Sequence, residues 1–136
     1  MLCNPYLIFK GNCREAFKAY EKILGGKVTA MMTYGETPAA EHTDASSHDM
    51  IIHARLTFGD NVLMASDSPP SHYEPMKGIS VARHVDTAEE AERLFKALAE
   101  GGDVKMPIQE TFWAIRYGML VDRFGTPWMI NCAKEQ

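Results

Sequence analysis

Cysteine is scarce in this chain: there are three among 136 residues, and none stands in a CxxC pair. An odd number of cysteines without such a pair argues against a disulfide framework and against a zinc finger. Cys13 stands where the pattern below predicts the start of a helix, and a helix dipole favours a reactive thiolate there. The alternative, which we favour, is a small and partly buried thiol.

Long apolar segments and an excess of either charge are also missing. No apolar run approaches the length of a membrane-spanning helix, and the formal net charge of −4 provides no basic surface for nucleic acid or lipid. The opening stretch MLCNPYLIFKGN lacks the features of a secretory leader. We therefore expect a soluble cytoplasmic protein without nucleic-acid or membrane partners. Its 46% of hydrophobic residues suffice for one domain with a core.

The first part of the chain predicts a strand, a helix and a second strand. PYLIFKG is a short apolar run, and Asn12 then offers an N-cap with Glu15 as its capping-box partner. Gly25 and Gly26 would end this helix. The apolar stripe of the helix is Ala16, Phe17, Tyr20, Ile23 and Leu24. KVTAMMTYGE predicts the second strand, and residues 36–49 predict a mobile polar loop or a lid.

A hairpin with strict alternation follows this loop. Its two strands are MIIHARLTF and VLMASD, joined by the turn GDN. Alternation puts His53 and Arg55 on one face, with Ile51 and Thr57. The opposite, apolar face consists of Met50, Ile52, Ala54, Leu56 and Phe58. We expect the apolar face to pack under the helix and His53 to face a cleft.

After a Pro-rich connector the same pattern begins again. ISVARHVD predicts a strand, and a helix follows with Thr87 as its cap. The next extended segment contains Pro107, which indicates an edge strand or a bulge. The final hairpin, YGMLVDRFGTPWMINC, matches the earlier HARLTFGDNVLMASD. Aligning Leu56 with Leu120 places His53 on Tyr117, and one extra turn residue then places Met64 on Met129.

The chain is therefore interpreted as two copies of one βαβββ module. We predict a single α+β domain over residues 1–136, with modules at about 1–68 and 79–136 and a connector at about 69–78. Each module leaves one sheet face without a helix, so two modules can form a curved mixed sheet around a cleft.

The tandem βαβββ pattern with the DRFGTPW turn resembles the vicinal oxygen chelate superfamily of glyoxalases, bleomycin-resistance proteins and dioxygenases. The resemblance is closer still to its PhnB-like branch and covers most of the chain. It rests on PYLIFKGNCREAFKAYEKILGG, MIIHARLTFGDNVLMASDSPP and QETFWAIRYGMLVDRFGTPWMINC. The resemblance implies a glyoxalase-like fold, a homodimer and, in metal-dependent members, two metal ligands from each module. That branch has also been labelled a methyltransferase, but no glycine-rich turn for S-adenosylmethionine follows the first strand.

At the four positions to which the resemblance assigns metal ligands, this chain has neither histidine nor a carboxylate. They fall on Met64, Met129, Ser80 and either Asn4 or Pro5. A thioether is a poor ligand for Zn²⁺, Mn²⁺ or Mg²⁺. We therefore predict no metal and no other cofactor. A metal cluster formed by the loop residues His42, Asp44, His48 and Asp49 fits no standard spacing, and we expect a solvated loop there.

Seven residues are predicted to contact a small-molecule ligand: His53, Met64, Asp67, Glu110, Trp113, Tyr117 and Met129. Three of them, His53, Glu110 and Tyr117, are candidates for acid–base catalysis. Each of the seven residues also has a purely structural interpretation. For Asp67 this interpretation is the capping of a turn.

Two functions follow from these residues. The first is binding of a small, partly apolar molecule by a PhnB-like protein without the usual metal ligands. The alternative is an enzyme of the lyase, isomerase or dioxygenase class, which uses His53, Glu110 and Tyr117 or an atypical metal site.

Overall fold

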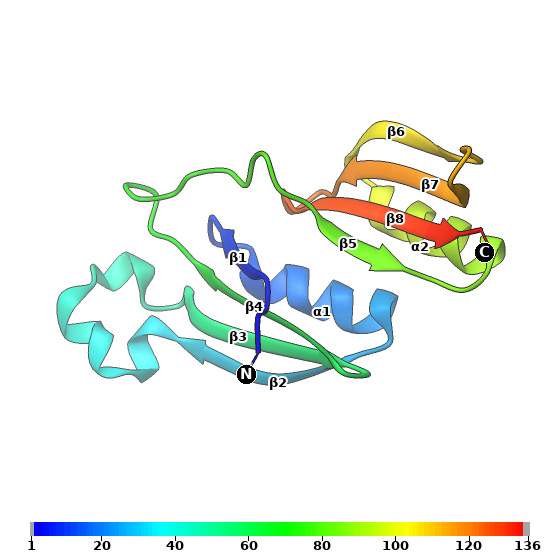
Figure 1. The fold of residues 1–136 in the computed structure, drawn as a ribbon. Coiled ribbons are helices and arrows are strands. Elements are labelled where there is room, and N and C mark those ends of the chain that lie inside the picture. The colour runs from blue at the N-terminus through cyan, green and yellow to red at the C-terminus, as the bar shows by residue number, and fades with distance from the viewer. Residues whose placement is uncertain (1, 135–136) are drawn as a thin grey trace. The chain divides into compact units, whose positions relative to one another are not determined.

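A computed structural model describes residues 2–134, which form two four-stranded mixed sheets, each with one long helix (Figure 1). The chain divides into two compact units, Met1–Pro75 and Met76–Gln136, so the boundary falls within the Pro-rich connector. The first unit contains β1 (Tyr6–Phe9), α1 (Cys13–Leu24), β2 (Lys27–Thr33), β3 (Ile51–Phe58) and β4 (Asn61–Asp67). The second contains β5 (Val81–His84), α2 (Ala88–Ala99), β6 (Asp103–Gln109), β7 (Ala114–Val121) and β8 (Pro127–Ala133).

The two sheets have the same topology. Their strand orders are β1-β4-β3-β2 and β5-β8-β7-β6, with the first pair of each parallel and the others antiparallel. The register also repeats, since Arg55 pairs with Met64 in the first sheet as Met119 pairs with Met129 in the second. The predicted duplication and α+β class are confirmed, and β6, which contains Pro107, lies at a sheet edge as expected.

Each helix covers one face of its own sheet and buries the apolar residues of that face. In the first unit Phe17 of α1 packs edge-on against Phe9 of β1 and also contacts Tyr20 of its own helix. The buried strand residues of this unit are Leu7, Phe9, Ile51, Ala54, Leu56, Leu63 and Ala65. In the second unit the core comprises Leu94, Phe95, Leu98, Leu120, Trp128, Ile130 and Cys132, among others.

The same two structural requirements explain why a pair of glycines follows each helix. Gly25 and Gly101 have positive φ angles of 73° and 74°, which suit glycine at the end of a helix. Gly26 and Gly102 instead lie against backbone, because a Cβ atom would meet Thr57 O at 2.5 Å and Val121 O at 2.4 Å. The second glycine of each pair therefore lets the chain pass close to the following hairpin.

The predicted capping box at the start of α1 is wrong, whereas the cap of α2 is confirmed. The Asn12 side chain makes no capping hydrogen bond. The Cys13 backbone N–H at the start of α1 instead donates to the Asp67 carboxylate, at the end of β4. In α2, Thr87 Oγ1 accepts a hydrogen bond from the Glu90 backbone N–H at 3.1 Å.

Two further expectations for the first unit need correction. A register shift between Met32 and Thr33 breaks the alternation of β3, so Ile51 is buried on the helix side and does not share the face of His53. Residues 36–49, expected to be an irregular loop, contain 3-10 turns at Pro38–His42 and Ala45–Ser47. Another such turn, Tyr34–Glu36, precedes them. The Thr33 hydroxyl caps the turn Tyr34–Glu36, and the Thr37 hydroxyl caps the turn Pro38–His42.

Among residues 2–134, no helix has the length and apolar character needed to span a bilayer.

Candidate functional site

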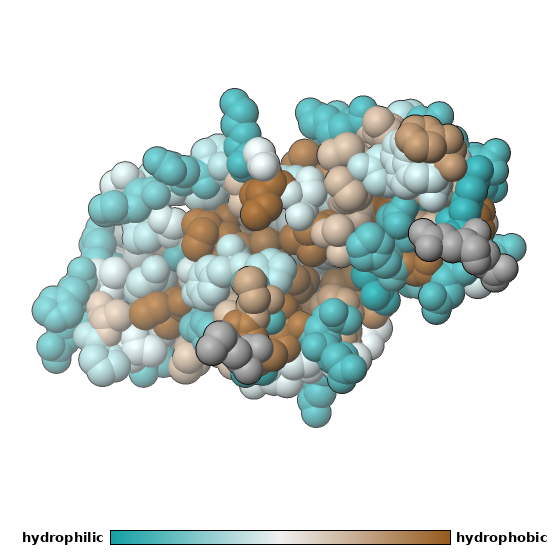
Figure 2. Space-filling model, in the orientation of Figure 1, coloured by the Kyte–Doolittle hydropathy of each residue, from teal (hydrophilic) through white to brown (hydrophobic). Residues whose placement is uncertain are grey.

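The first sheet presents one face that α1 does not cover, which we call the first open face. It is formed by the side chains that alternate with the buried ones. Across the strands, Tyr6, Met64, Arg55 and Ala30 lie in one row. The next row includes Ile8 beside Ser66 and Met32 beside His53. Figure 2, drawn in the orientation of Figure 1, shows hydrophobic and hydrophilic residues interspersed over this sheet.

His53 lies on the first open face, as the alternation predicted, and its neighbour there is Tyr6. The Tyr6 hydroxyl is 3.5 Å from His53 Nδ1, and the two rings stack with centroids 6.1 Å apart. Tyr6 is 45% exposed, while His53 is only partly exposed. Sequence reasoning did not single out Tyr6; the signal for it was the parallel register of β1 with β4, which the sequence did not reveal.

Asp67 has a structural role on the opposite side of the sheet. Its side chain is 1% exposed, and its Oδ1 accepts hydrogen bonds from the backbone N–H groups of Gly11 and Cys13 at 2.9 and 3.0 Å. Its Oδ2 accepts a third from Ile51 N–H at 2.8 Å. Because both oxygens are occupied and face α1, we leave Asp67 out of the candidate site.

The second sheet has a matching second open face, rich in thioether side chains. Ala82, Met129, Met119 and Met106 form one row across β5, β8, β7 and β6. The adjacent row consists of His84, Asn131, Tyr117 and Gln109. Here the Asn131 side-chain amide lies 3.1 Å from His84 Nδ1. No local pattern singled out His84, because only the pairing of β5 with β8 puts it beside Asn131.

Glu110, Trp113 and Tyr117 are predicted to contact one ligand, but in the structure Glu110 does not lie with the other two. Trp113 packs edge-on against Tyr117 with ring centroids 5.2 Å apart. Glu110 is exposed and pairs with Lys134, the charged atoms being 3.6 Å apart. Arg116 turns to the helix side, where its guanidinium lies 3.1 Å from Glu92 of α2. Trp113 and Tyr117 therefore remain together, whereas the carboxylate and the guanidinium have other partners.

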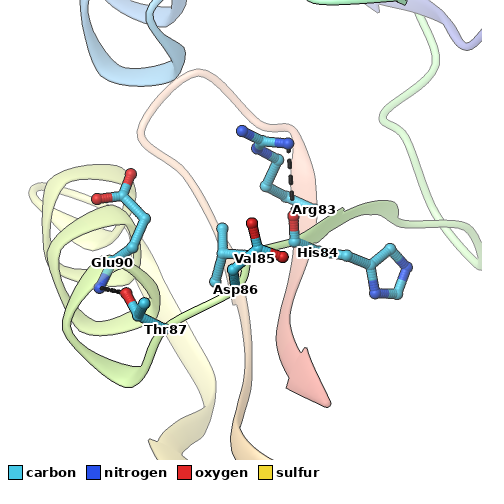
Figure 3. Close-up of a pocket in the computed structure, with 6 residues that line it drawn as sticks. All are labelled: Arg83, His84, Val85, Asp86, Thr87 and Glu90. Carbon is cyan, nitrogen blue, oxygen red and sulfur yellow. Dashed lines mark hydrogen bonds between the residues drawn. The ribbon is translucent and has the colours of Figure 1, made fainter. Parts of the chain in front are cut away.

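A separate polar pocket of about 290 Å³ lies where β5 leads into α2. It is lined by Arg83, His84, Val85, Asp86, Thr87 and Glu90. Figure 3 shows the His84 ring directed away from α2 and the Thr87 hydroxyl at the backbone of Glu90. None of the seven residues predicted to contact a ligand lines this pocket.

No group of three His, Cys, Asp or Glu side chains in residues 2–134 is placed to hold a metal ion. The Nε2 atom of the loop residue His48 is within hydrogen-bonding distance of the carbonyl oxygens of Ala40 and Thr43, at 3.1 and 3.3 Å. Next to Met64 and Met129, on the neighbouring parallel strands, lie Tyr6 and Ala82. The absence of a resident metal remains a prediction.

The buried thiol of Cys13 and the half-buried phenol of Tyr34 have shifted pKa values, and both shifts favour the neutral form. Burial, followed by the nearby Asp67 carboxylate, raises the pKa of the Cys13 thiol far above its ordinary value. Burial and the charge of Asp67 also raise the pKa of Tyr34, whose hydroxyl donates to the Asp67 carbonyl oxygen at 2.9 Å. Of the two interpretations of Cys13, the structure supports the buried, unreactive thiol.

We expect a thiol reagent to distinguish the three cysteines in the native protein. Cys3 is exposed, whereas Cys13 and Cys132 are buried. Iodoacetamide at pH 8 should therefore alkylate Cys3 rapidly and the other two only after denaturation, as peptide mass spectrometry would show. Rapid alkylation of Cys13 in the folded state would contradict its burial.

Comparison with known proteins agrees with the fold and provides the family. A family model described as 3-demethylubiquinone-9 3-methyltransferase matches residues 2–131. Protein YjdN of Escherichia coli K12 is 35% identical over 144 residues, which cover 100% of this chain and 98% of YjdN. The crystal structure of protein PA1353 from Pseudomonas aeruginosa is 51% identical with a TM-score of 0.91, and 99% of each chain is covered.

Two more distant structures show the same fold. The PhnB protein from Bacillus cereus is 22% identical with a TM-score of 0.82, covering 98% of this chain and 100% of its own. A glyoxylase/bleomycin resistance protein/dioxygenase domain from Frankia is 13% identical with a TM-score of 0.66, covering 98% of each chain. With its repeated modules and these matches, the chain belongs to the PhnB-like family described as 3-demethylubiquinone-9 3-methyltransferase, on the glyoxalase/bleomycin-resistance fold.

Proposed function

We propose that this protein binds a small, partly apolar molecule on the open faces of its sheets and does so without a resident divalent metal. The observation that carries the proposal is the pair of rows containing Met64 and Met129. Where the resemblance assigns metal ligands, these rows present thioether, aromatic and methyl groups, and their one charged side chain is the cationic Arg55. Such side chains bind apolar ligands and are unsuited to hard cations.

The metal content of the purified protein tests this proposal. Protein produced without added metal should contain well below one equivalent of Zn, Mn or Ni per chain by elemental analysis. Calorimetric titration with Zn²⁺ or Mn²⁺ should show no tight site. One tightly held ion per chain, lost in the Met64→Ala or Met129→Ala variant, would overturn the proposal. Met76, which lies in the connector outside both sheets, provides the control substitution Met76→Ala.

The acid–base alternative has less support from the contacts of its three residues. The partner of His53 is a phenol, and Glu110 pairs with a lysine. The only carboxylate in strands β1–β4, Asp67, lies on the far side of the sheet from His53. Methyl transfer from S-adenosylmethionine is not proposed either, because both sheets are mixed and small, unlike the doubly wound parallel sheets that bind nucleotide cofactors.

The homodimer, the cytoplasmic location and a cleft shared by the two modules remain predictions. Native mass spectrometry would measure the oligomeric state and any retained metal in one experiment, and a dimer without metal is the expected species.

A further inference from the structure

We propose that the first open face binds an oxyanion group, a carboxylate or a phosphoryl group, carried by the ligand. This inference rests on the proposed function, because it specifies which polar group accompanies the apolar body of the bound molecule. Arg55 supplies the positive charge and His53 donates a hydrogen bond, while Met64 and Tyr6 contact the apolar body.

The strands of this sheet contribute positive charge to the first open face. Strands β1–β4 contain two cations, Lys27 and Arg55, and a single carboxylate. That carboxylate, Asp67, is buried on the α1 side, where three backbone N–H groups surround it. The strands themselves therefore place no negative charge on the open face, and the charge that they contribute there attracts an anion.

Arg55 is available for a ligand. It is exposed, and within residues 2–134 its guanidinium forms no ion pair. A guanidinium binds carboxylate and phosphoryl groups through two parallel hydrogen bonds, so its planar fork suits an oxyanion better than a neutral acceptor.

His53 presents a donor on the same face. Its Nδ1 faces the Tyr6 hydroxyl, so we assign Nδ1 as the acceptor and place the ring hydrogen on Nε2. His53 and Arg55 are two residues apart on one side of β3, so their Cα atoms lie about 7 Å apart. One oxyanion can reach both side chains across this spacing, and Met64, opposite Arg55, then lies beside the rest of the molecule.

Benzoate and benzyl alcohol form a matched pair of probes, because their rings are the same and only benzoate carries an oxyanion. Each is titrated into ¹⁵N-labelled protein, with inorganic phosphate as a third probe, and the amide signals of Met64 and Ser66 and the His53 ring signals are followed. We expect benzoate to bind about ten-fold more tightly than benzyl alcohol, the effect of one charge-assisted hydrogen bond. Phosphate shifts without benzoate shifts would assign the site to phosphoryl groups.

Two substitutions distinguish a specific anion site at Arg55 from non-specific electrostatic attraction of the anion to the protein. Arg55→Gln should weaken benzoate binding about ten-fold and leave benzyl alcohol binding unchanged. Arg14→Gln removes the same charge from the exposed side of α1 and should change neither. Retention of the native amide spectrum in both variants shows that they are folded.

Equal binding of benzoate and benzyl alcohol would overturn the oxyanion site while leaving the proposed binding function in place. Failure of both benzoate and phosphate to shift the first open face would also overturn it. The metal measurements test the proposed function separately, since they do not depend on Arg55.

Discussion

Replacement of Asp67 by alanine is expected to lower the free energy of unfolding by about 4 kcal/mol. The substitution leaves the backbone N–H groups of Gly11, Cys13 and Ile51 without their acceptor in a buried site. Each unsatisfied buried donor costs about 1–3 kcal/mol, so the total falls among the largest effects of single substitutions. Urea denaturation followed by circular dichroism measures the change.

Two further substitutions, Asp67→Asn and Asp60→Ala, complete this experiment. The amide introduced by Asp67→Asn keeps one oxygen acceptor and replaces the other by a donor, so its destabilisation should be smaller than that of alanine but clear. Asp60, exposed in the turn between β3 and β4, should tolerate alanine with a change of about 0.5 kcal/mol. An Asp67→Ala protein as stable as Asp60→Ala would show that the three hydrogen bonds do not support the fold.

Replacement of Asp122 by alanine is expected to cost about 3 kcal/mol and to loosen the turn between β7 and β8. Asp122 Oδ1 accepts from the backbone N–H groups of Phe124 and Thr126 at 2.9 and 3.0 Å. Its Oδ2 accepts from Trp128 Nε1 at 2.8 Å, and both side chains are buried. Loss of these charge-assisted hydrogen bonds accounts for the magnitude.

The indole of Trp128 reports on this turn directly. In Asp122→Ala, thermal unfolding followed by tryptophan fluorescence should begin at lower temperature, and the Trp128 indole N–H signal should move in the NMR spectrum. Asp103→Ala is the matched control, because Asp103 is exposed and pairs with Lys105 on the surface. An unfolding midpoint equal to that of the control would contradict the structural role of Asp122.

The strands and helices could be predicted because their signals are local and repeat along the chain. The match of the two hairpins predicted that Met64 and Met129 occupy equivalent positions, and the structure pairs them with the equivalent residues Arg55 and Met119. The glycine pair at 25–26 was predicted to end a helix, and Gly25 has the required positive φ.

The errors occur where contacts with distant parts of the chain set the local structure. Asn12 and Glu15 form a standard capping-box sequence, yet the Asn12 side chain makes no capping hydrogen bond. The N–H of the next residue, Cys13, is bound by the buried carboxylate of Asp67, which no local pattern reveals. Ile51 changed faces because a bulge shifts the register of β2 and β3, and alternation alone cannot reveal a bulge.

The sequence predicted which residues of the candidate site share a sheet face, but it did not predict which residues they contact. Alternation placed His53 and Arg55 on one face correctly, and Met64 lies opposite Arg55 on the adjacent strand. The contact of His53 with Tyr6, and that of His84 with Asn131, arise from parallel pairing of strands far apart in sequence. No periodicity in the chain encodes which residues of such strands meet.

The different caps of the two helices have a consequence for the order of folding. The cap of α2 comes from Thr87, three residues before the N–H that it receives, so this helix can start as soon as its own segment is ordered. The acceptor at the start of α1 lies 54 residues further along the chain. The hydrogen bond of the Cys13 N–H can therefore form only after β4 has docked beside β1, and we expect hydrogen exchange at this amide to require separation of β4 from the start of α1.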